Sequence, residues 1–185
     1  MIRTIFLVGK PGSGKETQAR LLAEKTGFTI LSTGEKFREL REHRNALGEH
    51  VRKEYDAGHL LPDWFADYLF EDAILNLPPE SGIIFEGSGR SKDQAAVVHT
   101  VCEWLNRPYV VMYLDISDDE AVKRMMGRGR PDSNTEEKIR TRLAAFAQTT
   151  TPALDYYRAN GVLVEIPGER TIEEIHRDIV SRLES

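Results

Sequence analysis

The sequence contains one cysteine, two tryptophans and no long apolar run among its 185 residues. The single cysteine, Cys102, excludes an intrachain disulfide and favours a reducing compartment. Because it lies in an apolar stretch, we expect Cys102 to be an ordinary packed residue. No run approaches the length of a membrane span, and the first strand pattern begins almost at Met1. We therefore expect a cytoplasmic protein without a membrane partner.

An excess of positive charge is also missing, since the net charge is −5. We therefore expect no nucleic-acid partner, and any basic site has to be local. The composition, 40% apolar and 30% charged, is ordinary for a globular protein. The length suits a single domain over residues 1–185 with a sizeable core.

Short β-branched and aromatic runs alternate with helix-forming segments from end to end. This alternation predicts an α/β fold, in which a five-stranded parallel sheet carries helices on both faces through right-handed crossovers. Ligands are then expected beyond the carboxyl ends of the strands. The expected strands are 4–8, 28–31, 83–86, 109–116 and 162–166.

Capping patterns predict where several helices begin. The pairs are Ser32 with Glu35, Ser91 with Gln94, Ser117 with Glu120, Asn134 with Glu137, and Thr171 with Glu174. The first of these helices is expected to end near Asn45, and the next to run from Leu47 to Ala57. The helix after Asn134 is expected to end near Gly161, with a bend around Pro152.

A glycine-rich loop, Gly9 to Thr17, separates the first strand from a helix and contains the pattern G-x-x-x-x-G-K. Its glycines allow successive N–H groups to face an anion, and the following helix adds its positive N-terminus. Lys15 supplies a mobile charge for the outer phosphates of a nucleotide. A chance match is the alternative, but the position between strand and helix strongly favours phosphate binding.

Three further polar groups follow predicted strands, so they are expected near the same cleft. Thr33 and Arg38 lie about one helical turn apart and could address one ligand, although for this pair alone a helix cap with a solvated arginine is the better explanation. Glu86 stands where an acid could hold water around Mg²⁺. Arg90 could bridge phosphates, and Gln94 could read a base edge or serve only as a cap.

The last group is a concentration of arginines in an otherwise acidic chain, which favours a polyphosphate ligand over purely solvated side chains. Arg124 and Arg128 are neighbours on one helix face, where like charges repel unless an anion lies between them. Arg140 and Arg142 cannot share a face, so one is expected to be functional and the other solvated. The series is Arg124, Arg128, Arg130, Arg140 and Arg142.

Taken together, these motifs resemble the adenylate kinases, within the nucleoside monophosphate kinase family. The resemblance covers essentially the whole chain. It implies a P-loop three-layer α/β/α fold with a core (1–32, 62–126, 134–185), a small helical flap over AMP (33–61) and a very short lid (127–133). The motifs are Gly9 to Lys15 with Thr17-Gln18, Leu31 to Gly34 with Arg38, Gly58 to Asp63, Glu86-Gly87 with Arg90 and Gln94, Arg130 and Asp132 before Glu136-Glu137, Arg142-Leu143, and Asp155 to Tyr157.

The resemblance also implies that a monomer converts ATP and AMP into two ADP in a Mg²⁺-dependent reaction. The residues expected to bind ATP are Pro11, Gly12, Ser13, Gly14, Lys15, Glu16, Thr17, Arg124, Arg128 and Gly168. For AMP they are Thr33, Arg38, His59, Leu60, Leu61, Gly87, Arg90, Gln94, Arg130 and Arg142. The expected catalytic residues are Lys15, Arg90, Arg128, Arg130 and Arg142. Glu86, through water, and Thr17 are the expected metal-side residues.

The sequence departs from this family pattern in three places. Glu16 replaces a glycine, and its carboxylate could ligate Mg²⁺, repel ATP or point into solvent, which we favour. Ser88-Gly89 replaces an aromatic residue and a proline, which predicts a looser placement of Arg90. The lid is shorter than the family's short form, and it lacks the cysteines of the zinc-bearing variant.

Two other functions are compatible with the sequence. One is a UMP/CMP or broad-specificity nucleoside monophosphate kinase, although Thr33, where pyrimidine-specific relatives tend to carry alanine, favours AMP. The other is a nucleotide-binding regulatory module with weak turnover, which Glu16 and the short lid suggest.

Overall fold

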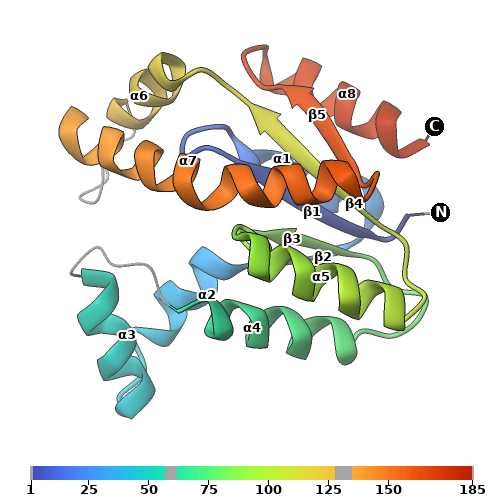
Figure 1. Ribbon diagram of the computed structural model, residues 1–185, viewed down its shortest axis with the longest axis horizontal. Coiled ribbons are helices and arrows are strands. Elements are labelled where there is room, and N and C mark those ends of the chain that lie inside the picture. The colour runs from blue at the N-terminus through green and yellow to red at the C-terminus, as the bar shows by residue number, and fades with distance from the viewer. Residues whose placement is uncertain (1, 57–61, 128–134, 185) are drawn as a thin grey trace.

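The computed structural model describes residues 2–56, 62–127 and 135–184, in which strands and helices alternate along the chain (Figure 1). The strands are β1 (Thr4–Gly9), β2 (Thr29–Ser32), β3 (Ile83–Glu86), β4 (Tyr109–Asp115) and β5 (Leu163–Pro167). The helices are α1 (Lys15–Thr26), α2 (Thr33–Leu40), α3 (Ala46–Asp56), α4 (Asp63–Leu75), α5 (Lys92–Trp104), α6 (Asp118–Met126), α7 (Glu136–Ala159) and α8 (Ile172–Glu184). No helix in these ranges is long and apolar enough to cross a membrane.

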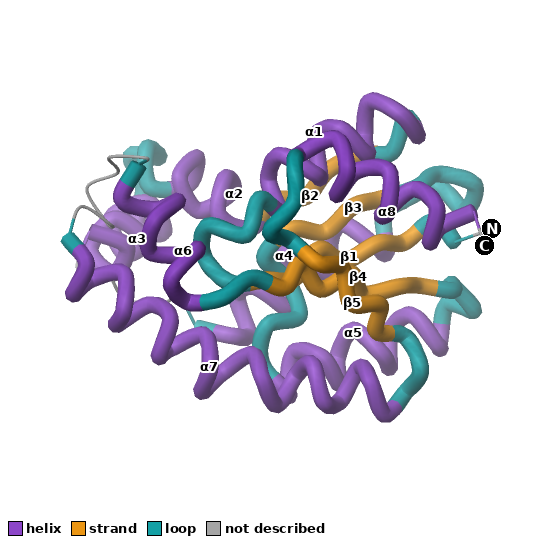
Figure 2. The backbone as a smooth tube through the Cα atoms, turned by 90° about the horizontal axis from the view of Figure 1, so that it is seen from above, coloured by secondary structure: helices purple, strands orange, loops and turns teal. Residues whose placement is uncertain are grey.

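The strands form one parallel sheet in the order β2-β3-β1-β4-β5. Helices α1 and α8 cover one face, and α4, α5 and α7 cover the other, as Figures 1 and 2 show from two directions. This arrangement confirms the predicted three-layer α/β/α fold with a five-stranded parallel sheet.

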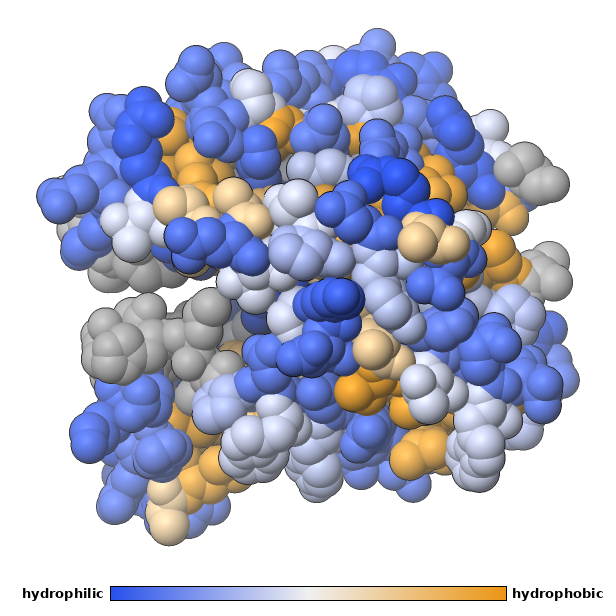
Figure 3. Space-filling model, viewed as in Figure 1, coloured by the Kyte–Doolittle hydropathy of each residue, from blue (hydrophilic) through white to orange (hydrophobic). Residues whose placement is uncertain are grey.

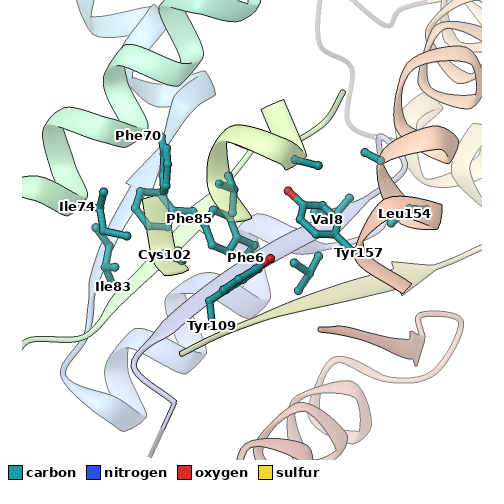
Figure 4. Packing of buried hydrophobic residues seen from close by; sticks show 14 residues of the cluster. Phe6, Val8, Phe70, Ile74, Ile83, Phe85, Cys102, Tyr109, Leu154 and Tyr157 are labelled. Carbon is teal, nitrogen blue, oxygen red and sulfur yellow. The ribbon is translucent and has the colours of Figure 1, made fainter. Parts of the chain in front are cut away.

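Alternation of side chains along β1 explains the two apolar layers. Ile5 and Leu7 pack towards α1 and α8, whereas Phe6 and Val8 pack towards α4, α5 and α7. The second layer is rich in aromatic rings (Figure 4), with Phe6 and Phe85 stacked at a centroid distance of 4.8 Å. Cys102 is buried in the same layer, where burial raises the pKa of its thiol to about 12, so it is a packed residue as expected.

The register brings the polar strand ends together. Leu7 of β1 lies beside Glu86 of β3, and Glu86 lies beside Ser32 at the end of β2. On the other side of β1, Gly9 lies beside Leu114 of β4. The loops that follow β1, β3 and β4 and the start of α2 therefore share one edge of the sheet.

Helix α2 is shorter than the sequence pattern predicts, since it ends at Leu40 and not near Asn45. The backbone tightens after it, where the His43 N–H donates to the Leu40 carbonyl. Asn45 does not end α2 but begins α3, because its Oδ1 accepts from the Gly48 N–H at 2.9 Å. The sequence pattern predicts Asn45 at the end of one helix, but its side chain caps the next.

The start of α7 also differs from the prediction. The cap is Thr135, whose hydroxyl accepts from the Lys138 N–H, and not Asn134, which lies outside the described residues. Both positions offer a capping oxygen, so the local pattern could not separate them. Pro152 lies inside α7, which continues to Ala159.

Helices α2, α3 and α4 share a small apolar cluster of their own beside the sheet. In it Phe37 of α2 stacks on Phe65 of α4 at 5.6 Å, and Val51 of α3 is buried against them. Figure 1 shows α3 standing away from the sheet, at the end of the molecule that carries the strand ends. Helix α3 packs chiefly against α2, and α2 in turn contacts β2 and β3 of the sheet.

An acidic group on α4 makes the stability depend on pH. Partial burial, followed by repulsion from Asp63, Glu71 and Asp93, raises the pKa of Asp67 to about 6. Because the folded chain binds this proton more tightly than the unfolded chain, Asp67 stabilises the fold at low pH. That contribution is lost as the pH rises through about 6.

We therefore expect Asp67→Asn to be as stable as the wild type near pH 4 and more stable near pH 8. Solvent screening of a partly exposed group limits the gain to about 1 kcal/mol, or about 2–4 °C in Tm. Thermal unfolding across pH 4–8 measures it, with Glu103→Gln on α5 as an exposed control. Equal Tm values for Asp67→Asn and the wild type at pH 8 would contradict the prediction.

Candidate active site

The glycine-rich loop between β1 and α1 adopts a backbone that only glycine accepts easily. Gly12 and Gly14 have φ angles of 86° and 94°, in the left-handed region, and Gly14 caps α1 directly before Lys15. The Ser13 N–H closes a turn on the Lys10 carbonyl at 3.1 Å. The loop therefore ends at the positive N-terminus of α1, as a phosphate-binding loop requires.

Lys15 reaches back over this loop. Its Nζ donates to the Gly9 carbonyl at 2.7 Å and to the Lys10 carbonyl at 3.1 Å, and it lies 3.4 Å from Ser13 Oγ. Two of the acceptors that hold the ammonium at the loop are backbone carbonyls, which bear no full charge. A phosphate oxygen is a stronger partner than these carbonyls, because the bond would join two ions.

Close packing fixes the loop against the β4–α6 connection. A Cβ on Gly9 would come within 2.7 Å of the Leu114 carbonyl oxygen, so the two backbones approach too closely for a side chain. Lys10 Nζ donates to the Ile116 carbonyl at 2.8 Å and pairs with Asp118 at 2.7 Å. Sequence reasoning missed Lys10, because the partners that give it a role are more than 100 residues away in the chain.

A cavity of about 300 Å³ lies beside the loop, on the side of α6 and α8. At its edge Arg124 donates to the Gly168 carbonyl at 2.9 Å and pairs with Glu120 at 2.7 Å. Arg124, Gly168 and the loop residues, predicted separately for ATP, are thus brought together. The lining residues are Gly12, Ser13, Gly14, Thr17, Gln18, Arg124, Arg170, Thr171, Ile172 and Ile175.

On the β3 side of the loop, hydroxyl groups connect the start of α2 with the end of β3. Ser32 Oγ donates to the Glu86 carboxylate at 2.8 Å. The hydroxyls of Thr33 and Ser88, both buried, lie 3.0 Å apart. The two predicted site segments are therefore in direct contact, and Ser32 orients the Glu86 carboxylate.

Arg90 follows the second glycine loop, residues 87–89, and lies within electrostatic range of the other predicted residues. Burial lowers the pKa of its guanidinium, Glu86 raises it, and the positive charge of Arg142 lowers it further. The charge of Arg142, on α7, thus acts on Arg90 over a range at which charges still interact. Two neighbouring cations in an acidic chain favour an anionic ligand between them.

The remaining predicted residues differ in their surroundings. Gln94 is buried as the third residue of α5 in a capping box with Ser91, and its Oε1 accepts from the N–H groups of Arg90 and Ser91. Arg38 is exposed on α2, and Arg140 is exposed and paired with Glu136 at 2.7 Å. Of the two α7 arginines, Arg142 is therefore the one close to the site. His59, Leu60, Leu61, Arg128 and Arg130 lie outside the described residues.

Phosphate loops built at the carboxyl edge of a doubly wound sheet define P-loop nucleotide enzymes. Arginines on both sides of the phosphate loop are typical of the P-loop enzymes that transfer a phosphoryl group. A family model described as adenylate kinase matches residues 7–162. The chain belongs to the adenylate kinase family, whose members are nucleoside monophosphate kinases.

Curated relatives are similar over essentially their full length. The adenylate kinase of Leptospira biflexa is 36% identical over 188 residues, which cover 99% of this chain and all of the relative. Adenylate kinase 1 of Nostoc sp. is 36% identical and covers both chains completely. The adenylate kinase of Mycolicibacterium paratuberculosis is 36% identical over 92% of this chain and 93% of its own. These similarities favour adenylate kinase over the two alternative functions.

Glu16, which departs from the family pattern, lies beside a cation from its own helix. Its carboxylate pairs with Arg20 at 2.6 Å, and the same guanidinium lies 3.7 Å from Glu35 of α2. Arg20 therefore offsets part of the negative charge that Glu16 brings close to the phosphate loop.

Because Arg20 offsets this charge, we expect Glu16→Gln to change the KM for ATP by less than about twofold. Steady-state kinetics at saturating AMP measure this, with Glu24→Gln on the exposed face of α1 as the control. A severalfold lower KM for ATP in Glu16→Gln alone would mean that the carboxylate repels ATP. A severalfold higher KM would mean that it helps to hold the metal–nucleotide complex.

Proposed function

We propose that this chain catalyses reversible, Mg²⁺-dependent phosphoryl transfer from ATP to AMP, giving two ADP, as a cytoplasmic monomer. The observation that carries the proposal is the position of Lys15 between two arginine groups. Arg124 lines the cavity on the α6 side of the loop, and Arg90 with Arg142 lies on the β3 side. Two polyphosphates that meet at Lys15 would each have cations of their own.

The two sides suggest which nucleotide binds where. The cavity beside Gly12, Thr17 and Arg124 is large enough for part of a nucleoside and lies directly beside the loop, so we assign it to ATP. The side formed by Thr33, Gly87 and Arg90 then takes AMP. In this proposal residues 33–61 are the flap over AMP, and residues 127–133 are the lid over ATP.

The chemistry asks little of the protein beyond alignment and charge. The attacking atom is an oxygen of the AMP phosphate, which is already anionic at neutral pH, so no side chain has to remove a proton. Lys15 holds the outer phosphates of ATP, while Arg90 and Arg142 hold the acceptor phosphate and stabilise charge on the transferred group. Closure of the flap and lid would keep water from taking the phosphoryl group.

The residues near the loop fit a magnesium ion that arrives with the nucleotide. Mg²⁺ keeps several waters and takes few protein ligands, with phosphate oxygens supplying the others. Glu86, held through one oxygen by Ser32, is suited to bind a metal-bound water, and Thr17 offers a hydroxyl on the ATP side. When bound, the ion would neutralise charge on the phosphates of ATP.

A panel of acceptors tests the activity and its specificity together. With ATP and Mg²⁺, we expect AMP to be the best acceptor, dAMP to react more slowly, and GMP, CMP and UMP to be poor. Coupled assay of ADP formation gives kcat/KM for each acceptor. A preference for CMP or UMP would mean that a pyrimidine monophosphate, and not AMP, is the acceptor. Calorimetry that shows ATP binding without any ADP formation would support the regulatory module.

Replacing the loop lysine tests the central role given to it. We expect Lys15→Met to lower kcat by about 100-fold or more, because a preorganised charge that contacts the transferred group is lost. The control is Lys25→Met, at the exposed end of the same helix, which should keep wild-type rates. Comparable kcat values for Lys15→Met and the control would remove Lys15 from the mechanism.

A further inference from the structure

Two glycines, Gly87 and Gly89, precede Arg90 at positions where the backbone does not easily accept a side chain. Gly87 and Gly89 have φ angles of 91° and 68°, which strain any residue with a Cβ. A Cβ on Gly89 would also overlap Tyr157 Oη, since Tyr157 lies directly against this glycine. The loop and Tyr157 are thus fitted to each other.

Tyr157 comes from α7 and is completely buried in the aromatic layer over the sheet (Figure 4). Its hydroxyl donates to the Gly89 carbonyl at 3.1 Å. Burial raises the pKa of this hydroxyl well above its usual value, so the group keeps its proton and remains a donor. A buried tyrosine needs such a partner, and here the partner is the loop before Arg90.

The same peptide unit is held at its other end. The Arg90 N–H donates to Gln94 Oε1 at 2.8 Å, while the carbonyl of that peptide, from Gly89, accepts from Tyr157. Because a peptide unit is planar, two opposed hydrogen bonds fix its orientation and therefore the direction in which the Arg90 Cα projects its side chain. Helices α5 and α7 each supply one of the two bonds.

We propose that Tyr157 is a positioning residue that fixes the guanidinium of Arg90 through the Gly89 carbonyl. The proposal rests on the proposed function only in the role that it gives to Arg90. The contact of Ser88 with Thr33 holds the loop from a third side, and it does not involve the Gly89–Arg90 peptide. Position 89 needs glycine for two reasons: its φ angle is positive, and a Cβ there would overlap the Tyr157 hydroxyl.

The test compares two buried tyrosines from which only the hydroxyl is removed. Tyr157→Phe should lower kcat/KM for AMP by about tenfold, through both a higher KM for AMP and a lower kcat, because Arg90 is misplaced. The KM for ATP should change by less than about twofold, since the proposed function assigns Arg90 to the AMP side. Steady-state kinetics in both substrates measure these values.

The matched control is Tyr109→Phe, in the same apolar layer. The Tyr109 hydroxyl bonds to His99 Nδ1 at 2.9 Å and not to the loop. Both variants should lower the Tm, because each loses a buried hydrogen bond. Only Tyr157→Phe should affect AMP kinetics. Equal kinetic effects of the two variants, or unchanged AMP kinetics in Tyr157→Phe, would overturn the proposal.

A double variant tests the fit to Gly89. Gly89→Ala should lower kcat/KM for AMP by about 100-fold, because its new methyl group displaces Tyr157 or the loop. Removing the tyrosine oxygen relieves that overlap, since the next ring atom is an ordinary 3.5 Å away. The double variant Gly89→Ala/Tyr157→Phe should therefore be more active than Gly89→Ala alone. If the losses in kcat/KM of the two single variants simply multiplied in the double variant, that result would count against a direct contact between Gly89 and Tyr157.

Unfolding measurements separate this proposal from the proposed function. The stabilities of the wild type, the two single variants and the double variant form a cycle that needs no substrate. A positive coupling between positions 89 and 157, found in a protein that makes no ADP from ATP and AMP, would retain the contact and reject the function. Active protein with no coupling in stability or kinetics would retain the function and reject Tyr157.

Discussion

The parallel alignment of β1 with β3 is the constraint on which the site depends. Leu7 and Glu86 are paired residues, so the two glycine loops that follow these strands begin at almost the same level of the sheet. A strand in the opposite direction would send the second loop to the far edge. The aromatic packing of Phe6 on Phe85 holds the same two strands together from one face. Core packing and placement of the phosphate loop therefore have a common origin.

The site gathers like charges, which works against folding. Burial lowers the pKa of Arg90, and the positive charge of Arg142 lowers it further, so the charged form is disfavoured in this position. Lys15 donates to two backbone carbonyls in the neighbouring loop, and the charge of Glu86 offsets part of the repulsion at Arg90. In the proposed function, the phosphates of the two nucleotides would offset this repulsion between cations.

Much of this could be predicted from the sequence, because the relevant signals are local. The strand–glycine loop–helix order, the five strands and the Ser91–Gln94 capping box each depend on neighbouring residues. The roles of Lys10 and Tyr157 could not be predicted, since their partners are brought close only by the sheet order. Asn45 was assigned to the wrong helix because an asparagine suits either end, and only the direction of its side chain decides between them.

Pro152 divides α7 at the boundary between two apolar clusters. Ile139 and Leu143 before it pack with α6, whereas Ala153 and Tyr157 after it pack over the sheet. Proline has no N–H for the carbonyl four residues earlier, at Gln148, so the helix resists bending least at this point. One helix therefore joins Arg142, in the part that packs with α6, to Tyr157, in the part that packs over the sheet.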